Sequence, residues 1–520
     1  MSAVPNRIVA NRLDRAIAYV SPGWALRRHR ARVLAAAYEA ADPGRLRTRH
    51  RDYGSGNTAV AQGGAAVRTQ ARALERNHDL ARNAINVLVQ NVIGPNGIGV
   101  EFQPRTRSGD IDEPVAEQLR TLHAQWCKRP EVTWQHDWAS AQRLLGRTWI
   151  RDGEALVQEL MGRVFGLDHA TPVPYALELI EPDLLPFEAT DLTRGLLHGV
   201  ERNAWGRPIA YHLYKQHPGD PSGFVLPERK RVSADRIRHL KLIDRIGQVR
   251  GISLFASVLT RLDDLKDYEE SERIAAKIAA SMAAVIIKGD PNLYPEAGYL
   301  DSQGQPVAQR RMRFAPGMVF DDLRPGEDVK TISSDRPNAN LEPHRNGQLR
   351  AVAGGFGVSF SSLAKNYNGT YSAQRQELVE QYGAYGVLSM EFIHQLARPI
   401  TERFVAMAYA SGQLVLSADS DPAALTDALY IAPAMPWIDP MREAEALALM
   451  EDNVFMSAPE IIRRRGANPR DVLDQESSWQ QKLREWGLVR VGKSVAPAPT
   501  AAQAKADATQ AAAVAAGEDA

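Results

Sequence analysis

Apolar residues recur three and four positions apart in several long stretches of the chain, which is the spacing of one face of an α-helix. The pattern first predicts a helix over residues 65–94, ended by a Gly-Pro pair, and then helices at about 113–127 and 137–151. A longer amphipathic pattern predicts one helix from Ser253 to Ile286. At 1.5 Å per residue that helix would be roughly 50 Å long.

Two further predicted helices flank a polar stretch in the second half of the chain. One covers residues 340–356 and the other residues 373–412, where Pro399 predicts a kink. Between them, residues 357–372 are rich in Gly, Asn, Ser and Tyr. Polar residues crowded between two helices usually form a surface loop, and such loops often carry function.

Short runs of strand-forming residues, separated by turn residues, replace the helical pattern between about residues 154 and 245. A hairpin turn is predicted at Asn203–Gly206, and one more strand within residues 97–104. The other predicted strands are 154–160, 174–180, 196–202, 208–214 and 237–243. Long helices combined with this β region predict an α+β fold.

The remaining segments have weaker patterns. Residues 1–64 are basic and then Gly-rich, which predicts a partly ordered arm, and residues 287–339 contain turns and short strands. Residues 413–490 contain helical patterns. Residues 491–520 hold 13 Ala among Pro, Thr, Gln and Gly, a composition that predicts a disordered tail.

Composition is that of an ordinary globular protein, with 44% hydrophobic and 24% charged residues in a chain of 520. That length allows two to four domains. No apolar run reaches the roughly 18 to 20 residues that span a bilayer, and the first 20 residues lack the apolar core of a secretory signal. The single cysteine, Cys127, excludes an internal disulfide and suits a reducing compartment; we interpret it as a buried or incidental thiol.

Charge is balanced overall but not locally. The formal net charge is +1, whereas a protein that grips DNA through many phosphates is clearly basic. Residues 1–53 nevertheless carry 11 Arg against 4 acidic residues. This segment is either a solvated basic arm or a contact with nucleic acid or an acidic partner.

Known catalytic patterns are absent from the sequence. It contains no G-x-x-x-x-G-K-[ST] phosphate loop and no H-E-x-x-H zinc motif. The Gly-rich run at 94–99 follows a helix and precedes a strand, the reverse of a dinucleotide site. Glu181 and Asp183 end a predicted strand more readily than they form an acid/base pair. We therefore expect no catalytic residue, no metal and no cofactor, and the protein is not predicted to be an enzyme.

Several sequence stretches, taken in order, resemble the portal proteins of tailed bacteriophages, and most closely the lambda-like portal family. The resemblance extends over about residues 19–488. Within it, Arg68, Arg72, Arg76, Asn77 and Gly94 match the family's most recognisable helix, and His239, Arg250 and Gly251 precede the long helix. The stretches that carry it are "YVSPGWALRRHRAR", "VRTQARALERNHDLARNAINVLVQNVIG", "GVERNAWGRPIAYHLY", "IRHLKLIDRIGQVRGISLFASVL", "GVSFSSLAKNYNGTYSAQR", "PWIDPMREAEA" and "GANPRDVLDQESSWQQKL".

The resemblance implies a ring, commonly of twelve subunits, at one vertex of the capsid of a virion. Double-stranded DNA would pass through its centre during packaging and ejection. The implied partners are the large subunit of the terminase motor, the major capsid and scaffold proteins, and head-completion or adaptor proteins, with no membrane. The protein would be in the host cytoplasm during assembly and would serve as the head-tail connector of the particle.

Family architecture implies a role for each segment. A basic arm (1–64) precedes a wing of helices and strands (65–252). Two stem helices (253–286 and 340–356) enclose a small α/β clip (287–339). A tunnel loop (357–372), a long kinked wing helix (373–412), C-terminal wing or crown helices (413–490) and the tail (491–520) complete the chain.

Three groups of residues are candidates for function under this resemblance. The tunnel loop offers Lys365, Asn366, Tyr367, Asn368 and Tyr371 as weak contacts to passing DNA. The first stem helix offers Asp263, Asp264, Asp267 and Glu270 as channel-lining residues. Between residues 261 and 273 this helix has 6 acidic and 3 basic residues, and a near-neutral or acidic lining would not hold phosphates. The clip offers Arg310, Arg311 and Arg313 as contacts to a partner or to DNA.

Two alternatives remain open at this level. The acidic residues of the first stem helix could bind Mg²⁺ in a DNA-processing enzyme. Against this, we interpret them as spread around the helix with no second cluster to complete a site. The chain could also be a capsid component that conducts nothing and binds nucleic acid through its basic arm.

Overall fold

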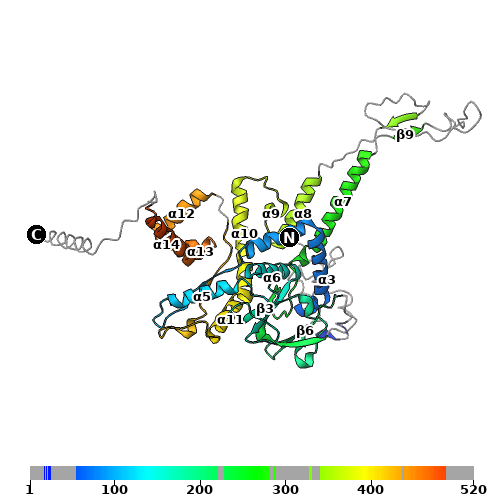
Figure 1. Ribbon diagram of the computed structural model, residues 1–520. Coiled ribbons are helices and arrows are strands. Elements are labelled where there is room, and N and C mark those ends of the chain that lie inside the picture. Colours follow the sequence, from blue (N-terminus) through cyan, green and yellow to red (C-terminus); the bar gives the residue numbers. More distant parts are fainter. Residues whose placement is uncertain are drawn as a thin grey trace, which may run out of the picture. The chain divides into compact units, whose positions relative to one another are not determined.

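The computed structural model describes residues 17, 19, 21–24, 54–220, 228–281, 285–288, 327–330, 340–435 and 439–487. The chain divides after Thr58 into two units, and almost all described residues belong to the second. That unit mixes α-helices with short antiparallel strands (Figure 1), so the mixed helix-and-strand class predicted from the sequence is confirmed. Most of the predicted clip, most of the basic arm and the whole predicted tail lie outside the described residues.

The helix predicted over residues 65–94 is in fact two helices, α3 (Gly56–Asn77) and α4 (Asp79–Val92). It begins earlier than predicted, inside the stretch assigned to the arm, because the Ser55 hydroxyl accepts a hydrogen bond from the Thr58 backbone N–H. His78 breaks it by adopting an extended backbone with φ −128° and ψ 117°. Its ring nitrogens lie 3.1 Å from Asp79 Oδ1 and 3.3 Å from the Leu262 carbonyl oxygen. A tertiary contact therefore sets this break.

Helices α5 (Glu113–Trp126) and α6 (Trp138–Asp152) confirm the next two predicted helices. Aspartate side chains cap both, because Asp112 accepts from the Val115 N–H and Asp137 from the Ser140 N–H. Each helix carries its buried side chains on one face. Those of α4, α6 and the later long helix form one hydrophobic core that includes Leu88, Trp149, Phe392 and Phe404.

Two antiparallel sheets follow α6. The first has the strand order β3 (Tyr175–Ile180), β2 (Glu154–Met161), β8 (Ile237–Lys241). The second has the order β4 (Leu196–Leu197), β5 (Val200–Arg202), β6 (Pro208–Tyr214), β7 (Arg229–Ser233). A small hydrophobic cluster, which includes Leu156, Ile180, Tyr211, Leu213 and Val232, joins them.

The single strand predicted over residues 196–202 is a tight hairpin of β4 and β5. Gly199 adopts a left-handed backbone with φ 84°, which the turn requires. The turn at Asn203–Gly206 is confirmed, since Gly206 N–H donates to the Asn203 carbonyl. Strand β7 was not predicted because three of its five residues are Arg or Lys. Such residues are typical of edge strands, and β7 lies at one end of its sheet.

A second short pairing joins distant parts of the chain. β1 (Gly99–Phe102), which confirms the strand predicted in residues 97–104, pairs antiparallel with β11 (Ala428–Ile431). The short 3₁₀ segments η2 (Pro182–Leu184), η3 (Leu192–Arg194), η4 (Ala234–Arg236), η5 (Leu254–Ser257) and η7 (Pro422–Ala424) occupy connections.

The first predicted stem helix is shorter than residues 253–286. It begins as the 3₁₀ turn η5, continues as α7 (Leu259–Ser281), and gives way to strand β9 (Val285–Lys288), which pairs with β10 (Glu327–Lys330). Apolar residues at the end of the predicted helix therefore belong to a strand. The second predicted stem helix is confirmed as α8 (Leu341–Phe356).

The stretch predicted as a loop, 357–372, contains a short helix, α9 (Phe360–Ala364), and the next helix, α10 (Tyr371–Phe392), begins inside it. The long helix that follows passes through a π-helical segment, η6 (Ile393–Ala397), into α11 (Arg398–Ala410). Pro399 has no N–H to donate, which explains the altered pattern before it. The Gln395 side chain from this segment accepts from Lys241 N–H and donates to Lys241 C=O, so it closes the end of β8.

Three helices end the described chain: α12 (Pro440–Asp452), α13 (Ala458–Arg464) and α14 (Pro469–Glu485). They confirm the helical patterns of residues 413–490, although β11 within that range was not predicted. Figure 1 shows α12–α14 together in orange and brown.

Two backbone segments, Gly153 and residues 251–252, pass very close to each other where α6 ends and β2 begins. Gly153 has φ 87°, and a Cβ there would lie 2.2 Å from the carbonyl carbon of Ile252. A Cβ on Gly251 would lie 2.0 Å from the Gly153 carbonyl oxygen. Only glycine permits this approach, which brings the first residue of β2, Glu154, against the segment that carries Arg250.

Replacing Gly153 with Ala should therefore destabilise the protein. A left-handed alanine costs about 1 to 2 kcal/mol and the forced overpacking about 1 to 3 kcal/mol more. We expect a clear fall in the thermal unfolding midpoint. The matched control is Gly354→Ala in α8, where nothing lies within 4 Å of the new methyl group, so that the midpoint should rise or stay unchanged. An unchanged midpoint for Gly153→Ala would refute the close crossing.

Candidate functional site

Helices α7 and α8 pack together at their base through buried aromatic and aliphatic side chains. The rings of Phe255 and Phe356 meet edge to face with centroids 4.7 Å apart. Gly355 lets the helices approach closely, because a Cβ there would lie 2.3 Å from Val258 Cγ1. Figure 1 shows the two helices side by side, leading away from the sheets towards β9. This close packing fixes the direction of α7 and α8 relative to each other.

Polar contacts continue the pairing further along α7 and α8. Arg345 forms an ion pair with Glu269, and Arg261 donates to Gln348 at 2.9 Å. The rings of Tyr268 and His344 are 5.0 Å apart. The helices are therefore held by a mixture of apolar and polar contacts rather than by a continuous apolar seam.

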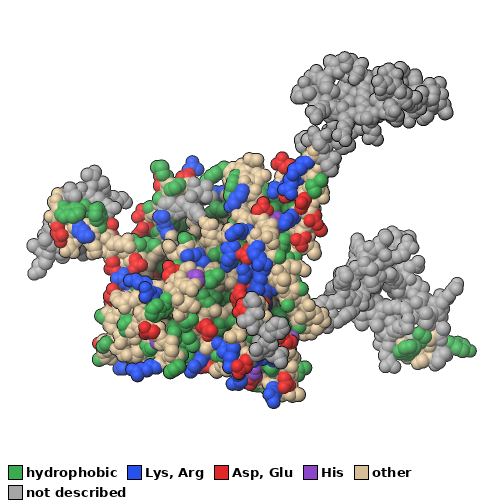
Figure 2. Space-filling view, turned by 45° about the vertical axis from the view of Figure 1, so that its right-hand side comes forward, with side chains coloured by type: hydrophobic (Ala, Val, Ile, Leu, Met, Phe, Trp, Pro, Cys, Tyr) green, Lys and Arg blue, Asp and Glu red, His purple; other side chains and the backbone are tan. Residues whose placement is uncertain are grey.

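The four acidic residues predicted to line a channel, Asp263, Asp264, Asp267 and Glu270, are all exposed on α7. At 100° per residue they fall within an arc of about 120°, opposite the buried Leu262 and Leu265. Together with Glu269 and Glu272, which fall outside this arc, the acidic residues of the helix do spread around it, as interpreted from the sequence, but these four share one side. They form one acidic face, and Figure 2 shows acidic side chains beside basic ones on this part of the surface.

The loop between α8 and α10 consists of an anchored half and an exposed tip. In the anchored half, Ser359 caps α9 and Leu363 is 1% exposed. Asn83 of α4 donates to the carbonyl oxygens of Ser362 and Leu363, both at 2.9 Å. Ser361 donates through its hydroxyl to Glu377 of α10 at 2.6 Å. Residues 359–364 are thus fixed to two helices of the body.

The tip, residues 365–370, begins at Lys365, which has a left-handed backbone with φ 53° and an exposed side chain. Asn366 Oδ1 accepts from the Asn368 N–H at 3.0 Å, which closes a turn inside the tip. Tyr367 and Tyr371 are more than half exposed. Among the described residues, no carboxylate forms an ion pair with Lys365. The five predicted loop residues thus lie close together in sequence, but not all in the tip: four belong to it, with Asn366 half-buried, and Tyr371 is the first residue of α10.

The three clip arginines predicted to contact a partner or DNA cannot be placed. Arg310, Arg311 and Arg313 lie outside the described residues.

Sequence reasoning missed a buried ionic cluster centred on Glu154, which is 0% exposed. Its carboxylate accepts hydrogen bonds from Arg68 at 2.7 Å, from Arg250 at 2.6 and 3.0 Å, and from the Gly251 N–H at 2.9 Å, and lies 3.0 Å from His239 Nε2. Burial alone would raise the pKa of Glu154. The Arg250 and Arg68 guanidiniums and the His239 hydrogen bond hold it well below its usual range.

Arg250 is itself fully buried and lies over the Phe187 ring, 4.1 Å from its centroid. Its remaining N–H groups reach the His198 and Pro182 carbonyl oxygens. The cluster therefore joins α3, both sheets and the segment before α7. The only sequence signal was the matching of Arg68, His239, Arg250 and Gly251 to one family.

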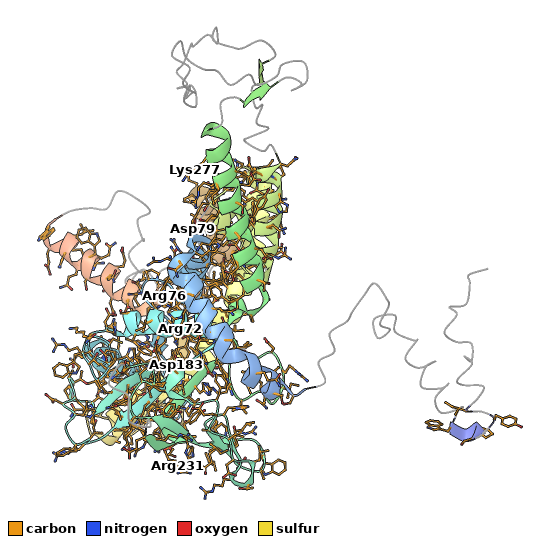
Figure 3. All side chains as sticks on the ribbon, turned by 90° about the vertical axis from the view of Figure 1, so that its right-hand side faces the viewer. Arg72, Arg76, Asp79, Asp183, Arg231 and Lys277 are labelled. Atoms are coloured by element: carbon orange, nitrogen blue, oxygen red, sulfur yellow. The ribbon has the colours of Figure 1, made fainter. Side chains whose placement is uncertain are left out.

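A more exposed ionic layer surrounds this cluster. Arg72 pairs with Asp152 at 2.7 Å and with Asp183, while Arg151 pairs with Asp152 at 2.7 Å and with Glu75 at 2.9 Å. Figure 3 shows Arg76, Arg72 and Asp183 following one another from top to bottom, the two arginines on α3 and Asp183 below them. Burial disfavours the charge of Asp183, but Arg68 and Arg72 lower its pKa.

Glu181, Asp183 and His217 form the one described group whose ligand atoms could surround a metal ion, all within 4.8 Å of one another. Arg72 lies 3.9 Å from Glu181 and also pairs with Asp183. A guanidinium at that position already neutralises these carboxylates and repels a cation. Glu181 and Asp183 are thus salt-bridge partners, and the acidic face of α7 contributes to no such group among the described residues.

Cys127 and His123 are half-buried and pack against core residues. Burial raises the pKa of the Cys127 thiol to about 12, so it is a poor nucleophile, as expected from the sequence. His123 lies among Phe102, Trp126 and Phe404, with ring centroids 5.3 to 5.7 Å away, and burial lowers its pKa to about 4. No helix among the described residues combines the length and hydrophobicity that a membrane crossing requires.

Comparison with known proteins gives the class to which this arrangement belongs. Residues 42–388, more than half of the chain, match the model of the family described as phage portal protein, lambda family. The chain belongs to this family of portal proteins, as the sequence resemblance indicated.

Two curated relatives support the assignment. The chain is 26% identical over 442 residues to the probable portal protein of Halomonas phage phiHAP-1, covering 81% of each chain. It is 22% identical over 463 residues to the portal protein of Escherichia phage N15, covering 81% of this chain and 85% of that one. A chain in the virion of a native gene transfer agent particle overlaps with 14% identity and a TM-score of 0.40, over 84% of this chain and 99% of that one.

Proposed function

We propose that this protein is a portal subunit with no chemistry of its own. Identical copies form a ring, commonly of twelve, at one capsid vertex of the virion, and double-stranded DNA passes through the ring during packaging and ejection. The observation that carries the proposal is the pair α7 and α8, which leads directly into an anchored loop with an exposed tip. Family membership over more than half of the chain supports it.

The charge arrangement suits a conduit. A uniformly basic channel would bind phosphates tightly and with steep salt dependence. The acidic face formed by Asp263, Asp264, Asp267 and Glu270 would repel phosphates, so that DNA could slide past it. In this proposal α7 and α8 are the stem, and residues 287–339 between them form the clip.

The loop tip would supply a weak and repeated contact. One exposed lysine per subunit, Lys365, gives a ring of separate positive charges rather than a continuous basic surface. Tyr367 and Tyr371 would present apolar bodies to the DNA. Because residues 359–364 are fixed to α4 and α10, the tip starts from a defined position. Its own exposed residues could still move when DNA passes.

The docking partners follow from the same proposal. The terminase large subunit would bind the ring during filling, head-completion or adaptor proteins would bind afterwards, and capsid and scaffold proteins would surround it. Arg310, Arg311 and Arg313 remain candidates for these contacts. Assembly would take place in the host cytoplasm.

Mass and symmetry of the purified protein test the proposal. Twelve copies of a 57.3 kDa chain would have a mass of about 0.7 MDa by light scattering, and end-on electron micrographs would show the rotational symmetry. A stable monomer with Mg²⁺-dependent nuclease activity would instead support the DNA-processing enzyme. A particle component without a central channel would support the capsid alternative.

Deleting the loop tip should separate assembly from DNA handling. A deletion of Lys365–Gly369 spares the buried Leu363 and the Ser361–Glu377 contact, so rings should still form. We expect packaged or retained DNA per particle to fall severalfold, and Lys365→Ala alone to give a smaller fall. The matched control is Lys128→Ala, a change of another exposed lysine outside the loop. Loss of rings on deleting the tip would make the loop structural.

A further inference from the structure

Helices α13 and α14 share little apolar packing with the rest of the chain. Among the described residues, none that follows Ala432 belongs to the hydrophobic core or to the smaller cluster between the two sheets. Within α13 and α14, which are described throughout, only Pro469 is buried, and Ile461 and Ile462 are half-buried. Apolar burial is the main force that holds the elements of a domain together, so a different interaction positions these two helices.

A two-pronged ion pair joins α13 to β1. Arg463 donates to both carboxylate oxygens of Glu101, at 2.7 and 3.0 Å, and the Glu101 side chain is 4% exposed. Gln103 donates to the same carboxylate at 3.1 Å, and Asn468 donates to the Val100 carbonyl oxygen at 3.4 Å. An arginine that holds a carboxylate by two parallel hydrogen bonds is the strong form of an ion pair. This contact is the least exposed part of the attachment.

Two further arginines join α14 to α5. Arg470 of α14 donates to both oxygens of Glu113, and Arg120 of α5 pairs with Asp471 and Asp474, both at 2.8 Å. The three carboxylates of these pairs are between 48% and 66% exposed, so dissolved salt reaches them. These pairs and the Arg463–Glu101 pair together form an ionic interface, to which each side contributes both signs of charge.

We infer that α13 and α14 form a releasable element, which the ionic interface holds against β1 and α5 at low ionic strength and frees at high ionic strength. Salt screens charges and so weakens ion pairs between partly exposed groups. The hydrophobic core includes nothing from α13 or α14 and therefore stays intact on release. The chain thus has a docked and a released form that share one folded body. This behaviour needs no ring, so it does not rest on the proposed function.

Hydrogen exchange of the full-length chain tests the release. Helix α13 has seven residues, and an isolated helix of that length is marginal in water, so exchange of its amides reports whether it is attached. Raising NaCl from about 0.1 M to about 1 M should speed exchange in α13 by about tenfold. Exchange in α6, which lies in the hydrophobic core, should stay the same. If salt leaves α13 unchanged, or speeds α6 equally, the inference is wrong.

Sodium sulfate at the same ionic strength distinguishes an ionic attachment from an apolar one. Both salts screen charges, but sulfate also strengthens the burial of apolar surface. We expect α13 to exchange faster in either salt, because charged groups hold it. Slower exchange of α13 in sulfate would show that the half-buried isoleucines of α13 hold the helices in place, and it would overturn the inference.

Arg463→Ala and Arg464→Ala form a matched pair of variants. Arg463 reaches Glu101 across the ionic interface, whereas the neighbouring Arg464 pairs with Glu460 inside α13 at 3.1 Å. At low salt, exchange in α13 should be about tenfold faster in Arg463→Ala than in the wild type, since removing one partner of a close charge pair speeds dissociation. Arg464→Ala should match the wild type. Alanine favours a helix at both positions, so equal exchange in the two variants would refute the role of the Arg463–Glu101 pair and with it the inference.

Discussion

Glu154→Gln should lower the stability of the protein by about 3 to 5 kcal/mol, the usual result of breaking a buried ion pair by removing one partner. The amide keeps the shape of the side chain but removes its charge, so Arg250 and Arg68 would remain buried, at 0% and 3% exposure, without their shared anion. The NH₂ group of the new amide would also face an N–H donor, with which it cannot form a hydrogen bond. Thermal or urea unfolding measures the change, and hydrogen exchange in β2 and β8 localises it.

The matched control is Glu201→Gln. Glu201 also bonds an arginine, Arg231, at 2.8 Å and a histidine, His212, at 3.1 Å, but this group lies at the surface. Exposed ion pairs are worth about 0 to 1 kcal/mol, so the control should be nearly neutral. Equal effects of the two substitutions would mean that the buried Glu154 cluster stabilises the fold no more than an exposed ion pair does.

Stability should also fall steeply between about pH 6.5 and pH 4, because desolvation disfavours the protonated form of two histidines in the folded chain. Burial lowers the pKa of His239 to about 4, despite its hydrogen bond to Glu154, and that of His123 to about 4. In this window the unfolded chain binds protons that the folded chain does not, so stability decreases as the pH falls. Each group contributes about 1.4 kcal/mol per pH unit.

His123→Phe separates this effect from general acid sensitivity. Phenylalanine suits a site between Phe102, Trp126 and Phe404, and it cannot titrate. The slope of unfolding free energy against pH should therefore drop by about 1.4 kcal/mol per pH unit between pH 6.5 and 4. His394→Phe, at an exposed position of the long helix, serves as the control. An unchanged slope in His123→Phe would show that the pKa of this ring is the same in the folded and the unfolded chain.

Helices with a clear apolar period were predictable, and so was the family. α5, α6 and α8 appear within a few residues of their predicted ends, because aspartate caps, a left-handed glycine and one-sided apolar faces are local signals. The loop between α8 and α10 was found from its polar composition. Its division into an anchored half and a tip was not, because the anchors Asn83 and Glu377 lie on other elements.

The remaining differences have tertiary causes. The break at His78 depends on the Leu262 carbonyl oxygen of α7, 184 residues away in sequence. Strand β7 forms because β6 offers it a hydrogen-bonding edge, although its Arg and Lys residues do not favour a strand. Helical spacing alone could have placed the four acidic residues of α7 on one arc. Only the burial of Leu262 and Leu265 shows that this arc faces away from the core.

The sequence by itself determined the periodic elements, the absence of known catalytic motifs, the balanced charge and membership of a portal family. These depend on neighbouring residues or on residue identity alone. The tertiary structure decided which polar residues are buried together. Arg68, Glu154, His239 and Arg250 lie on four separate segments, and only the close crossing at Gly153 and Gly251 brings their charges into one cluster. Long-range packing sets such contacts, and no local pattern encodes them.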